Sequence, residues 1–355
     1  MPRDPVMVHL RTGIAIPASP LALTNERKFD ERRQRALYRY YMDAGSGGVA
    51  VAVHTTQFEI REPRHGLFEP VLRLAAECLR EPRAGVDVNA LVRISGVCGH
   101  TDQAVREASL AAELNYDAVL LSLAALKNAS DDELIAHCST VADIMPLIGF
   151  YLQPAVGGRV LPYTFWRRFA GIKNVIAVKI APFNRYQTLE VVRAIFDSGR
   201  GKEICLYTGN DDNIIPDLIT PFNLRSAEGF IESLHIVGGL LGQFSVWTKT
   251  AVEMVREARA VGHCASEKYH DLLGRGVQLT DANAAVFDAA NQFAGCIPGI
   301  NEVLRRQGLL ANNYCLNPHE VLSPGQAEEL DRVNKAYKWL VDDEFVQEHL
   351  DEWMR

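Results

Sequence analysis

Lys179 has the most informative setting of any single residue in this sequence. It lies between Val178 and Ile180 in the apolar run VIAVKIA, residues 175–181. Burial disfavours the charged ammonium form and lowers the pKa of a lysine, and a neutral amine can attack a carbonyl carbon to form a Schiff base. A lysine near a strand end can also extend its amine outward into water. The pattern by itself leaves both interpretations open.

Two further groups suit the same chemistry. Tyr151 ends the preceding apolar run, in the segment FYLQP, residues 150–154. Neighbouring strands lie about 4.8 Å apart, so a phenol on one strand could move protons at a Schiff base on the next; a buried tyrosine bonded to a backbone acceptor is the plainer interpretation. Thr55 and Thr56 offer hydroxyls and amides suited to a small carboxylate, although a self-capping turn has the same pattern.

The elements that would position these residues alternate regularly. Continuous apolar strands in strict alternation with helices indicate a parallel sheet covered by helices. Eight such units in about 250 residues predict an α/β fold, a (β/α)₈ TIM barrel. A longer helical stretch is expected after residue 208. The expected strands are 13–18, 49–53, 90–97, 118–123, 146–152, 175–180, 204–208 and 239–246, and the expected helices include 30–44, 66–80, 102–115, 162–171, 186–198 and 247–260, with a Ser130–Glu133 capping box opening one more.

Barrel enzymes carry their sites at the carboxyl ends of the strands. The expected barrel covers residues 1–262, followed by a C-terminal helical extension over 263–355. An open nucleotide-binding sheet is disfavoured because neither GxGxxG after the first strand nor GxxxxGK[ST] occurs. A phosphate-binding barrel is disfavoured by the acidic segment TGNDD at 208–212. The polar residues expected to converge at the mouth are His54, Thr55, Thr56, Gly99, His100, Tyr151, Lys179, Thr208, Gly209, Asn210 and Asp211.

Composition excludes several classes of protein. The 355 residues carry 37 basic and 44 acidic side chains, a formal charge of -7, so nucleic acid is not an expected partner. No run approaches the ~18 apolar residues of a membrane span, and the first residues lack a signal peptide, so we expect no membrane partner and a cytoplasmic location. Seven scattered cysteines without a CxxC or Cys/His cluster indicate neither disulfides nor a metal site.

From about Gly13 to Gly308 the chain is similar to the dihydrodipicolinate synthase / N-acetylneuraminate lyase family of class I aldolases. The Tyr and Lys on consecutive strands, combined with the Thr-Thr loop, make the resemblance specific. The motifs that carry it are GIAIPASPL (13–21), HTTQFE (54–59), the stretch from Arg93 to Leu121, YLQP (151–154), VKIA (178–181), TGND (208–211) and VGGLLGQFSV (237–246).

The resemblance implies roles for the matched residues. Lys179 would form the imine with pyruvate or another 2-oxo acid, without a cofactor or metal. Tyr151 would shuttle protons to the aldol oxygen. Thr55 and Thr56 would hold the carboxylate, and Thr56 would relay protons to Tyr151. His54 and Gly209 would complete the substrate pocket. The family is usually oligomeric, which implies a homotetramer or homodimer.

Several positions depart from the family pattern. His54 and Gln57 replace glycines around the Thr-Thr pair, and Leu152 replaces an Asn or Asp. The arginine that dihydrodipicolinate synthases place after the Tyr motif is Val156 here, although Arg159 could reach in from a shifted loop. The stretch AALK at 124–127 lacks their interface tyrosine. The predicted function is therefore a Schiff-base aldolase or lyase that is not a true dihydrodipicolinate synthase; the alternative is a catalytically impaired member that binds a 2-oxo acid or sugar acid.

Overall fold

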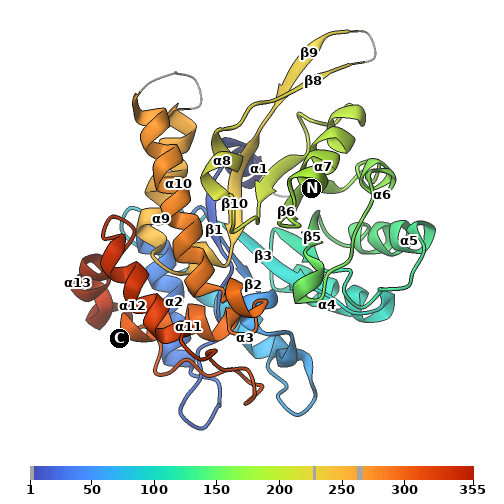
Figure 1. The fold of residues 1–355 in the computed structure, drawn as a ribbon. Coiled ribbons are helices and arrows are strands. Elements are labelled where there is room, and N and C mark those ends of the chain that lie inside the picture. Colours follow the sequence, from blue (N-terminus) through green and yellow to red (C-terminus); the bar gives the residue numbers. More distant parts are fainter. Residues whose placement is uncertain (1–3, 227–228, 262–266) are drawn as a thin grey trace.

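Eight parallel strands form a nearly closed barrel in this computed structural model, which describes residues 4–226, 229–261 and 267–355 (Figure 1). Every neighbouring pair in the sheet is parallel. A bridge between Ala18 and Ala50 joins the two end strands. The predicted TIM barrel is therefore confirmed. The strands, in sheet order, are β1 (Ala15–Pro17), β10 (Ile236–Leu241), β7 (Cys205–Thr208), β6 (Val175–Ala181), β5 (Leu147–Leu152), β4 (Ala118–Leu121), β3 (Val92–Val97) and β2 (Gly48–Val51).

One helix follows each barrel strand along the chain and packs outside the barrel. The first helix after β4 begins where the sequence predicts, because the Ser130 hydroxyl accepts from the Glu133 amide and the Glu133 carboxylate accepts from the Ser130 amide. The eight helices are α2 (Glu31–Asp43), α3 (Phe68–Cys78), α4 (Thr101–Glu113), α5 (Asp131–Ala142), α6 (Tyr163–Phe169), α7 (Arg185–Asp197), α8 (Ile214–Ile219) and α9 (Thr248–Val261).

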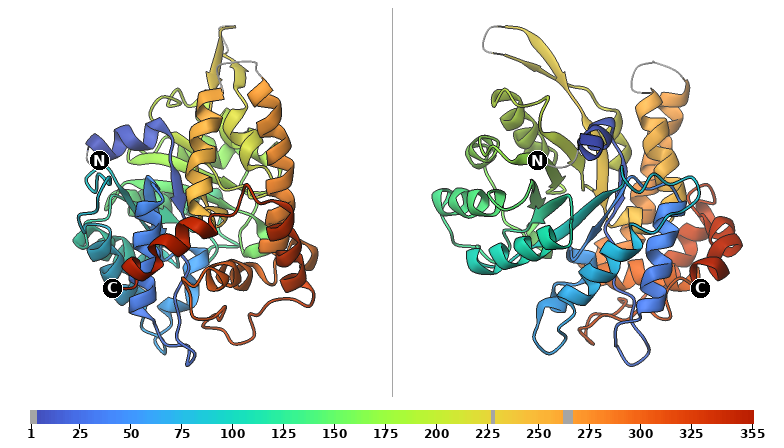
Figure 2. Two further views of the ribbon diagram at one scale, coloured as in Figure 1. Left: turned by 90° about the vertical axis from the view of Figure 1, so that its left-hand side faces the viewer. Right: turned by 180° about the vertical axis from the view of Figure 1, so that it is seen from behind.

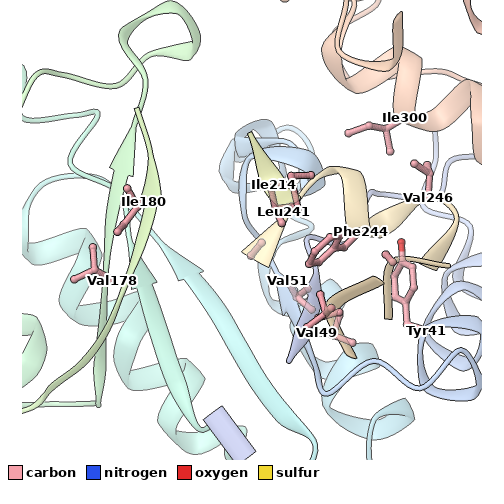
Figure 3. Close-up of a cluster of buried hydrophobic side chains, with 14 of the residues drawn as sticks. Tyr41, Val49, Val51, Val178, Ile180, Ile214, Leu241, Phe244, Val246 and Ile300 are labelled. Carbon is pink, nitrogen blue, oxygen red and sulfur yellow. The ribbon is translucent and has the colours of Figure 1, made fainter. Parts of the chain in front are cut away.

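Alternate residues of each strand supply two separate hydrophobic clusters, because successive side chains in a strand point to opposite faces. On β6, Val178 and Ile180 belong to the outer cluster between strands and helices, whereas Ala177 and Ala181 belong to the inner one. Figure 3 shows Val178 and Ile180 on β6 and outer-cluster side chains from the other side of the barrel. Lys179 therefore shares the inner face of β6 with two alanines.

Helix α1 (Asp4–Thr12) closes the end of the barrel opposite the carboxyl ends of the strands. Its Val6, Met7 and Leu10 pack in the inner cluster with Val92 and Cys205, which begin β3 and β7. The Tyr207 hydroxyl donates to the Leu10 carbonyl across 2.7 Å. The interior can therefore open only at the carboxyl ends.

The segment between β7 and β10 differs from the prediction. Instead of one longer helix it holds the six-residue α8 and then an antiparallel hairpin, β8 (Phe222–Arg225) and β9 (Ile231–Leu234), which projects from the barrel (Figure 1). Thr220 precedes Pro221, and a residue before proline is disfavoured in a helix; its ψ of 120° is extended. The eighth barrel strand also begins and ends earlier than the expected 239–246.

Four helices follow the barrel and gather on one side of it, orange to red in Figures 1 and 2. Helix α10 packs beside α8 and α12, and α13 packs on α2. In the part of the chain that the structure describes, none of the helices is long and apolar enough to cross a membrane. The C-terminal helices are α10 (Glu267–Val286), α11 (Cys296–Arg306), α12 (Gln326–Ala336) and α13 (Asp343–Trp353).

Candidate active site

A pocket opens at the carboxyl ends of the barrel strands, with an empty volume of about 560 Å³ that includes its mouth. Of the seven residues assigned to the substrate site or the chemistry, the structure brings four into the lining and leaves three out; Asp211, expected at the mouth, also lines the pocket. Those in the lining are His54, Thr55, Lys179 and Gly209; those outside it are Thr56, Tyr151 and Arg159.

Lys179 extends into this pocket and is only 8% exposed. Its Nζ lies 4.4 Å from the centre of the Phe150 ring, which faces it from β5. The lysine needs a glycine beside it: a Cβ at Gly209 would lie 2.7 Å from the lysine Cε and 2.8 Å from the Ala181 Cβ. Gly209 therefore serves the site by making room for the lysine stem.

Asp211, also in the lining, is a carboxyl group whose charge acts on Lys179. Burial lowers the pKa of Lys179, and the negative charge of Asp211 opposes that shift. Burial raises the pKa of the Asp211 carboxyl, and Lys179 opposes it in turn. No ion pair within 4 Å joins the two groups among the described residues, so neither is locked by the other. The lysine amine is thereby shifted toward its neutral, nucleophilic form.

The Thr-Thr loop is the 3₁₀ turn η1 (His54–Thr56), directly after β2. The Thr55 hydroxyl donates to the Ala18 carbonyl at 2.6 Å, and the Thr56 hydroxyl donates to the Ser19 carbonyl at 2.7 Å. These bonds fix the turn against the end of β1. They also commit both hydroxyl protons to the protein, so a bound carboxylate would find hydroxyl oxygens rather than hydroxyl donors there.

His54 presents an unpartnered imidazole to the pocket. No hydrogen bond joins its ring nitrogens to any other described residue, although the ring lies edge-on to Phe58 at 6.0 Å between centres. Burial and the nearby Lys179 charge lower the pKa of His54 to about 4. The ring is therefore neutral near pH 7, with one nitrogen as donor and the other as acceptor.

Tyr151 does not reach the pocket, and the expectation that it touches Lys179 is not met. Lys179 pairs in register with Phe150, and Tyr151 pairs with Ile180, which faces outward. The Tyr151 ring packs on Trp166 at 5.3 Å, and its hydroxyl accepts from the Leu161 amide at 3.2 Å. The geometry therefore supports the plainer interpretation, a buried structural tyrosine, and not the proton-shuttle role.

Arg159 is likewise engaged elsewhere. Its guanidinium donates to the carbonyls of Leu126 and Ala129, at 2.6 Å and 3.0 Å, in the loop after β4. The sequence suggested that a shifted loop could bring Arg159 into the pocket. In the structure these two hydrogen bonds hold its side chain outside the pocket. Among the described residues, the pocket lining includes no arginine at all.

Sequence reasoning missed the part of the site that comes from the C-terminal helices. Phe287, Phe293 and Cys296 line the pocket from α10, α11 and the link between them. The Phe293 ring meets Phe183 edge-on, with centres 5.7 Å apart. These residues could not be found by looking for polar side chains after each barrel strand, because they lie beyond the eighth strand and its helix. The position of Asp211 after a strand predicts that it lies at the mouth of the barrel, but the sequence assigns it no role.

Comparisons with known proteins agree with this architecture. No family model matches the chain. It is 33% identical over 128 residues to 4-hydroxy-tetrahydrodipicolinate synthase of Caldicellulosiruptor bescii, which is 35% of this chain and 41% of that relative. The same enzyme of Thermoanaerobacter sp. is 29% identical over 120 residues. The match thus spans about two fifths of the length of the curated relatives.

Solved structures share the fold over nearly the whole chain. Dihydrodipicolinate synthase from Aquifex aeolicus superposes with a TM-score of 0.73 at 18% identity, covering 93% of this chain and 99% of that one. N-acetylneuraminate lyase from Fusobacterium nucleatum, solved with pyruvate, superposes with a TM-score of 0.70 at 15% identity, covering 93% and 98%. The chain thus shares the fold of dihydrodipicolinate synthase and N-acetylneuraminate lyase over nearly its whole length, and about a third of it is similar in sequence to 4-hydroxy-tetrahydrodipicolinate synthases.

Proposed function

We propose that this protein is a class I aldolase or lyase that forms a Schiff base between Lys179 and pyruvate or another 2-oxo acid. One observation carries the proposal: a buried, unpaired lysine amine faces a pocket at the carboxyl ends of a TIM barrel. Burial shifts this amine toward the neutral form that attacks a keto carbon. The curated relatives that match part of the chain are named 4-hydroxy-tetrahydrodipicolinate synthase.

Asp211 is the group best placed to move protons during the reaction. It shares the pocket with Lys179, and burial raises its pKa toward neutral pH. A carboxyl group with such a pKa can donate a proton in one step and accept one in the next. Phe150, which faces the lysine, has no proton to give, so Asp211 takes the task that the resemblance assigned to Tyr151.

His54 is the proposed hydrogen-bond donor to the carboxylate of the 2-oxo acid, because the Thr55 hydroxyl proton already goes to the Ala18 carbonyl. His54 has an imidazole without a partner in the described structure, and as a neutral ring it can donate one hydrogen bond. Thr55 lines the same wall through the η1 turn. Thr56 supports the turn from outside the pocket through its bond to Ser19.

The experiment is reductive trapping of the imine. Incubation with pyruvate and borohydride should add one pyruvate-derived mass to the peptide that contains Lys179. Lys179→Ala should abolish the adduct. Lys127→Ala, in the loop after β4 and outside the pocket lining, is the matched control and should label normally. An adduct on another lysine, or none with any short 2-oxo acid, would overturn the proposal.

Asp211→Asn tests the proton-transfer role separately. The variant should still trap pyruvate, because the nucleophile remains, but turnover should fall by about 10²–10⁴, the loss typical of a removed acid/base group. Asp143→Asn, at an exposed position directly after α5 and in neither the Lys179 pocket nor the pocket beside it, serves as the control. Equal turnover of Asp211→Asn and the wild type would refute the assignment.

We further propose that the enzyme is not a dihydrodipicolinate synthase. That reaction condenses pyruvate with aspartate semialdehyde, whose own carboxylate needs a cationic contact. Arg159 is held by backbone carbonyls, and Asp211 would repel a second carboxylate. Condensation with aspartate semialdehyde at a kcat above about 1 s⁻¹, an ordinary enzymatic value, would disprove this.

A second candidate is a protein that binds a 2-oxo acid without turning it over. The observation that favours it is the phenylalanine at the inward position of β5, where no phenol reaches the lysine. The two candidates separate in one measurement. The binding protein would trap pyruvate at Lys179 yet show the same negligible turnover in the wild type and in Asp211→Asn.

A further inference from the structure

A second pocket adjoins the Lys179 pocket at its outer end. Its empty volume is about 330 Å³, and it lies against α10. Four residues line both pockets, so the two spaces are adjacent and share one wall. The shared residues are Phe183, Asp211, Phe287 and Phe293.

The wall of this adjoining pocket is mainly apolar. Three phenylalanine rings stand between it and the lysine pocket, and two of them, Phe183 and Phe293, meet edge to face with an interplanar angle of 76°. Its two uncharged polar side chains donate to backbone carbonyls: the Thr280 hydroxyl donates to the Asp212 carbonyl at 2.8 Å, and the Asn283 amide donates to the Asp211 carbonyl at 2.7 Å. The Asn283 Oδ1 is buried without a partner among the described residues. Ala284 and Ala289 complete the apolar surface.

The charged groups exclude a second acidic substrate from this space. Asp211 and Asp212 both line it, and among the described residues its lining contains no lysine or arginine. A carboxylate placed there would lose its hydration without gaining a cationic partner. A sugar-like chain would meet hydrogen-bond acceptors alone, the two carboxylates and the Asn283 Oδ1, beside three aromatic rings that offer its hydroxyls nothing. An apolar group, in contrast, gains by leaving water and contacting the rings.

We infer that the second substrate is an apolar aldehyde, an aromatic one above all, whose ring occupies the adjoining pocket while its carbonyl faces Lys179. The inference rests on the proposed Schiff-base function and adds the substrate class. Asp211 lies in both linings, at the junction of the two spaces. That is where the aldehyde oxygen of such a substrate would lie.

The chemistry balances with the groups present. The Lys179 amine and pyruvate form an imine and release water, and the Asp211 carboxylate takes a proton from C3 to give the enamine. The enamine carbon attacks the aldehyde carbon and a C–C bond forms, while the aldehyde oxygen takes a proton from the Asp211 carboxyl. Water then hydrolyses the imine, releasing a 4-hydroxy-2-oxo acid and the free lysine. Cleavage of that acid is the same sequence in reverse.

The test compares two aldehydes with the purified full-length protein. Pyruvate is supplied with benzaldehyde or with glyceraldehyde, and the 4-hydroxy-2-oxo acid product is quantified by mass spectrometry. We expect kcat/KM for benzaldehyde to exceed that for glyceraldehyde by about tenfold or more, the scale on which an apolar pocket discriminates. Preference for glyceraldehyde, or turnover of neither aldehyde, would overturn the inference.

Filling the adjoining pocket provides the matched variants. Ala284 is exposed at the surface of α10 and lines only this pocket, so Ala284→Phe should fold normally and block it. Benzaldehyde turnover should fall by about tenfold, with pyruvate trapping at Lys179 unchanged. Val277→Phe, on the same helix at a site 73% exposed and outside both linings, should change neither.

Trapping of the imine with pyruvate and borohydride distinguishes a failure of the proposed Schiff-base function from a failure of the substrate inference. Failure of wild-type trapping would defeat the proposed function and this inference with it. Normal trapping, combined with equal benzaldehyde turnover in Ala284→Phe and wild type, would defeat the inference alone and leave the Schiff-base function standing.

Discussion

At the level of single residues, the side chain of β5 that lies beside Lys179 is Phe150 and not Tyr151. This placement decides which groups can transfer protons in the site. Spacing from Pro154 matches Tyr151 to the family's tyrosine, but strand register decides which side chain points inward. Pairing between β5 and β6 shifts between Leu147 and Ile148, so Phe150 and Lys179 share the inner face. A one-residue shift moves a side chain across the sheet, and the sequence carries no sign of it.

Tyr151→Phe tests this placement directly. Turnover should stay within about threefold of wild type, in place of the 10²–10⁴-fold loss expected of an acid/base group. Stability should fall by about 1–3 kcal/mol, because the buried Leu161 amide loses its acceptor. Activity assays and urea unfolding measure the two effects. A large loss of turnover without a loss of stability would place Tyr151 back in the chemistry.

The pH dependence of imine formation follows from the Lys179 environment. Burial lowers its pKa below the ordinary value, and the neutral amine that reacts exists above that pKa. The rate should therefore rise with pH and reach half its maximum well below about 10.4, the value for a free lysine. Stopped-flow absorbance of the imine gives the profile.

Asp211→Asn tests the direction in which the Asp211 charge shifts the pKa of Lys179. The Asp211 charge favours the ammonium form of Lys179, so its removal should lower the pKa further. The midpoint should shift to lower pH. An unchanged midpoint would show that Asp211 is protonated over this pH range, and a shift to higher pH would contradict its electrostatic effect on Lys179.

At the level of elements, Arg61 fastens the loop that carries His54 and Thr55 to the barrel. Its side chain is 8% exposed and donates to both carboxylate oxygens of Glu107 on α4, at 2.9 Å and 3.0 Å. It also donates to the carbonyls of Ala52 and Gly96, at the ends of β2 and β3. The loop after β2 is thus held by one buried ion pair.

Arg61→Met should destabilise the protein by about 3–5 kcal/mol, because it leaves the Glu107 carboxylate buried without its cation. Urea unfolding provides the measurement. The control is Arg64→Met in the same segment, whose side chain is 65% exposed and pairs with Glu62; it should cost less than about 1 kcal/mol. Equal effects of the two variants would contradict the structural role of Arg61.

Periodicity predicted the barrel elements well and failed where other signals compete. Strands such as β6 are apolar apart from Lys179 and are bounded by turns, and the α5 start is defined by local capping chemistry. The β8–β9 hairpin was missed because its residues are largely exposed, with Phe230 70% and Ile231 61% accessible, so burial does not set their pattern. Weak patterning carries little information about exposed structure.

At the level of the whole molecule, the helices beyond the barrel have two different tasks. Helices α10 and α11 bring Phe287 and Cys296 to the mouth and so help to define the substrate. Helix α13 instead packs far from the pocket, on α2. The sequence predicted a helical extension but could not show this division, because contacts between residues some 300 positions apart leave no local pattern.

Trp353 is the residue that joins α13 to the barrel. It is fully buried; its ring lies 5.4 Å from that of Tyr40, and its indole nitrogen donates to the Asp43 carboxylate at 2.7 Å. Its backbone carbonyl accepts from Arg39 at 2.8 Å. All three partners come from α2, so this contact ties the end of the chain to its first barrel helix.

Trp353→Ala should therefore lower stability by about 3–5 kcal/mol, the cost of removing a buried aromatic side chain. Gln347→Ala, exposed on the same helix, should change it by less than about 0.5 kcal/mol. Under native conditions Trp353→Ala should still trap pyruvate at Lys179, because α13 contributes nothing to the pocket lining. Loss of trapping in a variant that circular dichroism shows to be folded would mean that the end of the chain shapes the site after all.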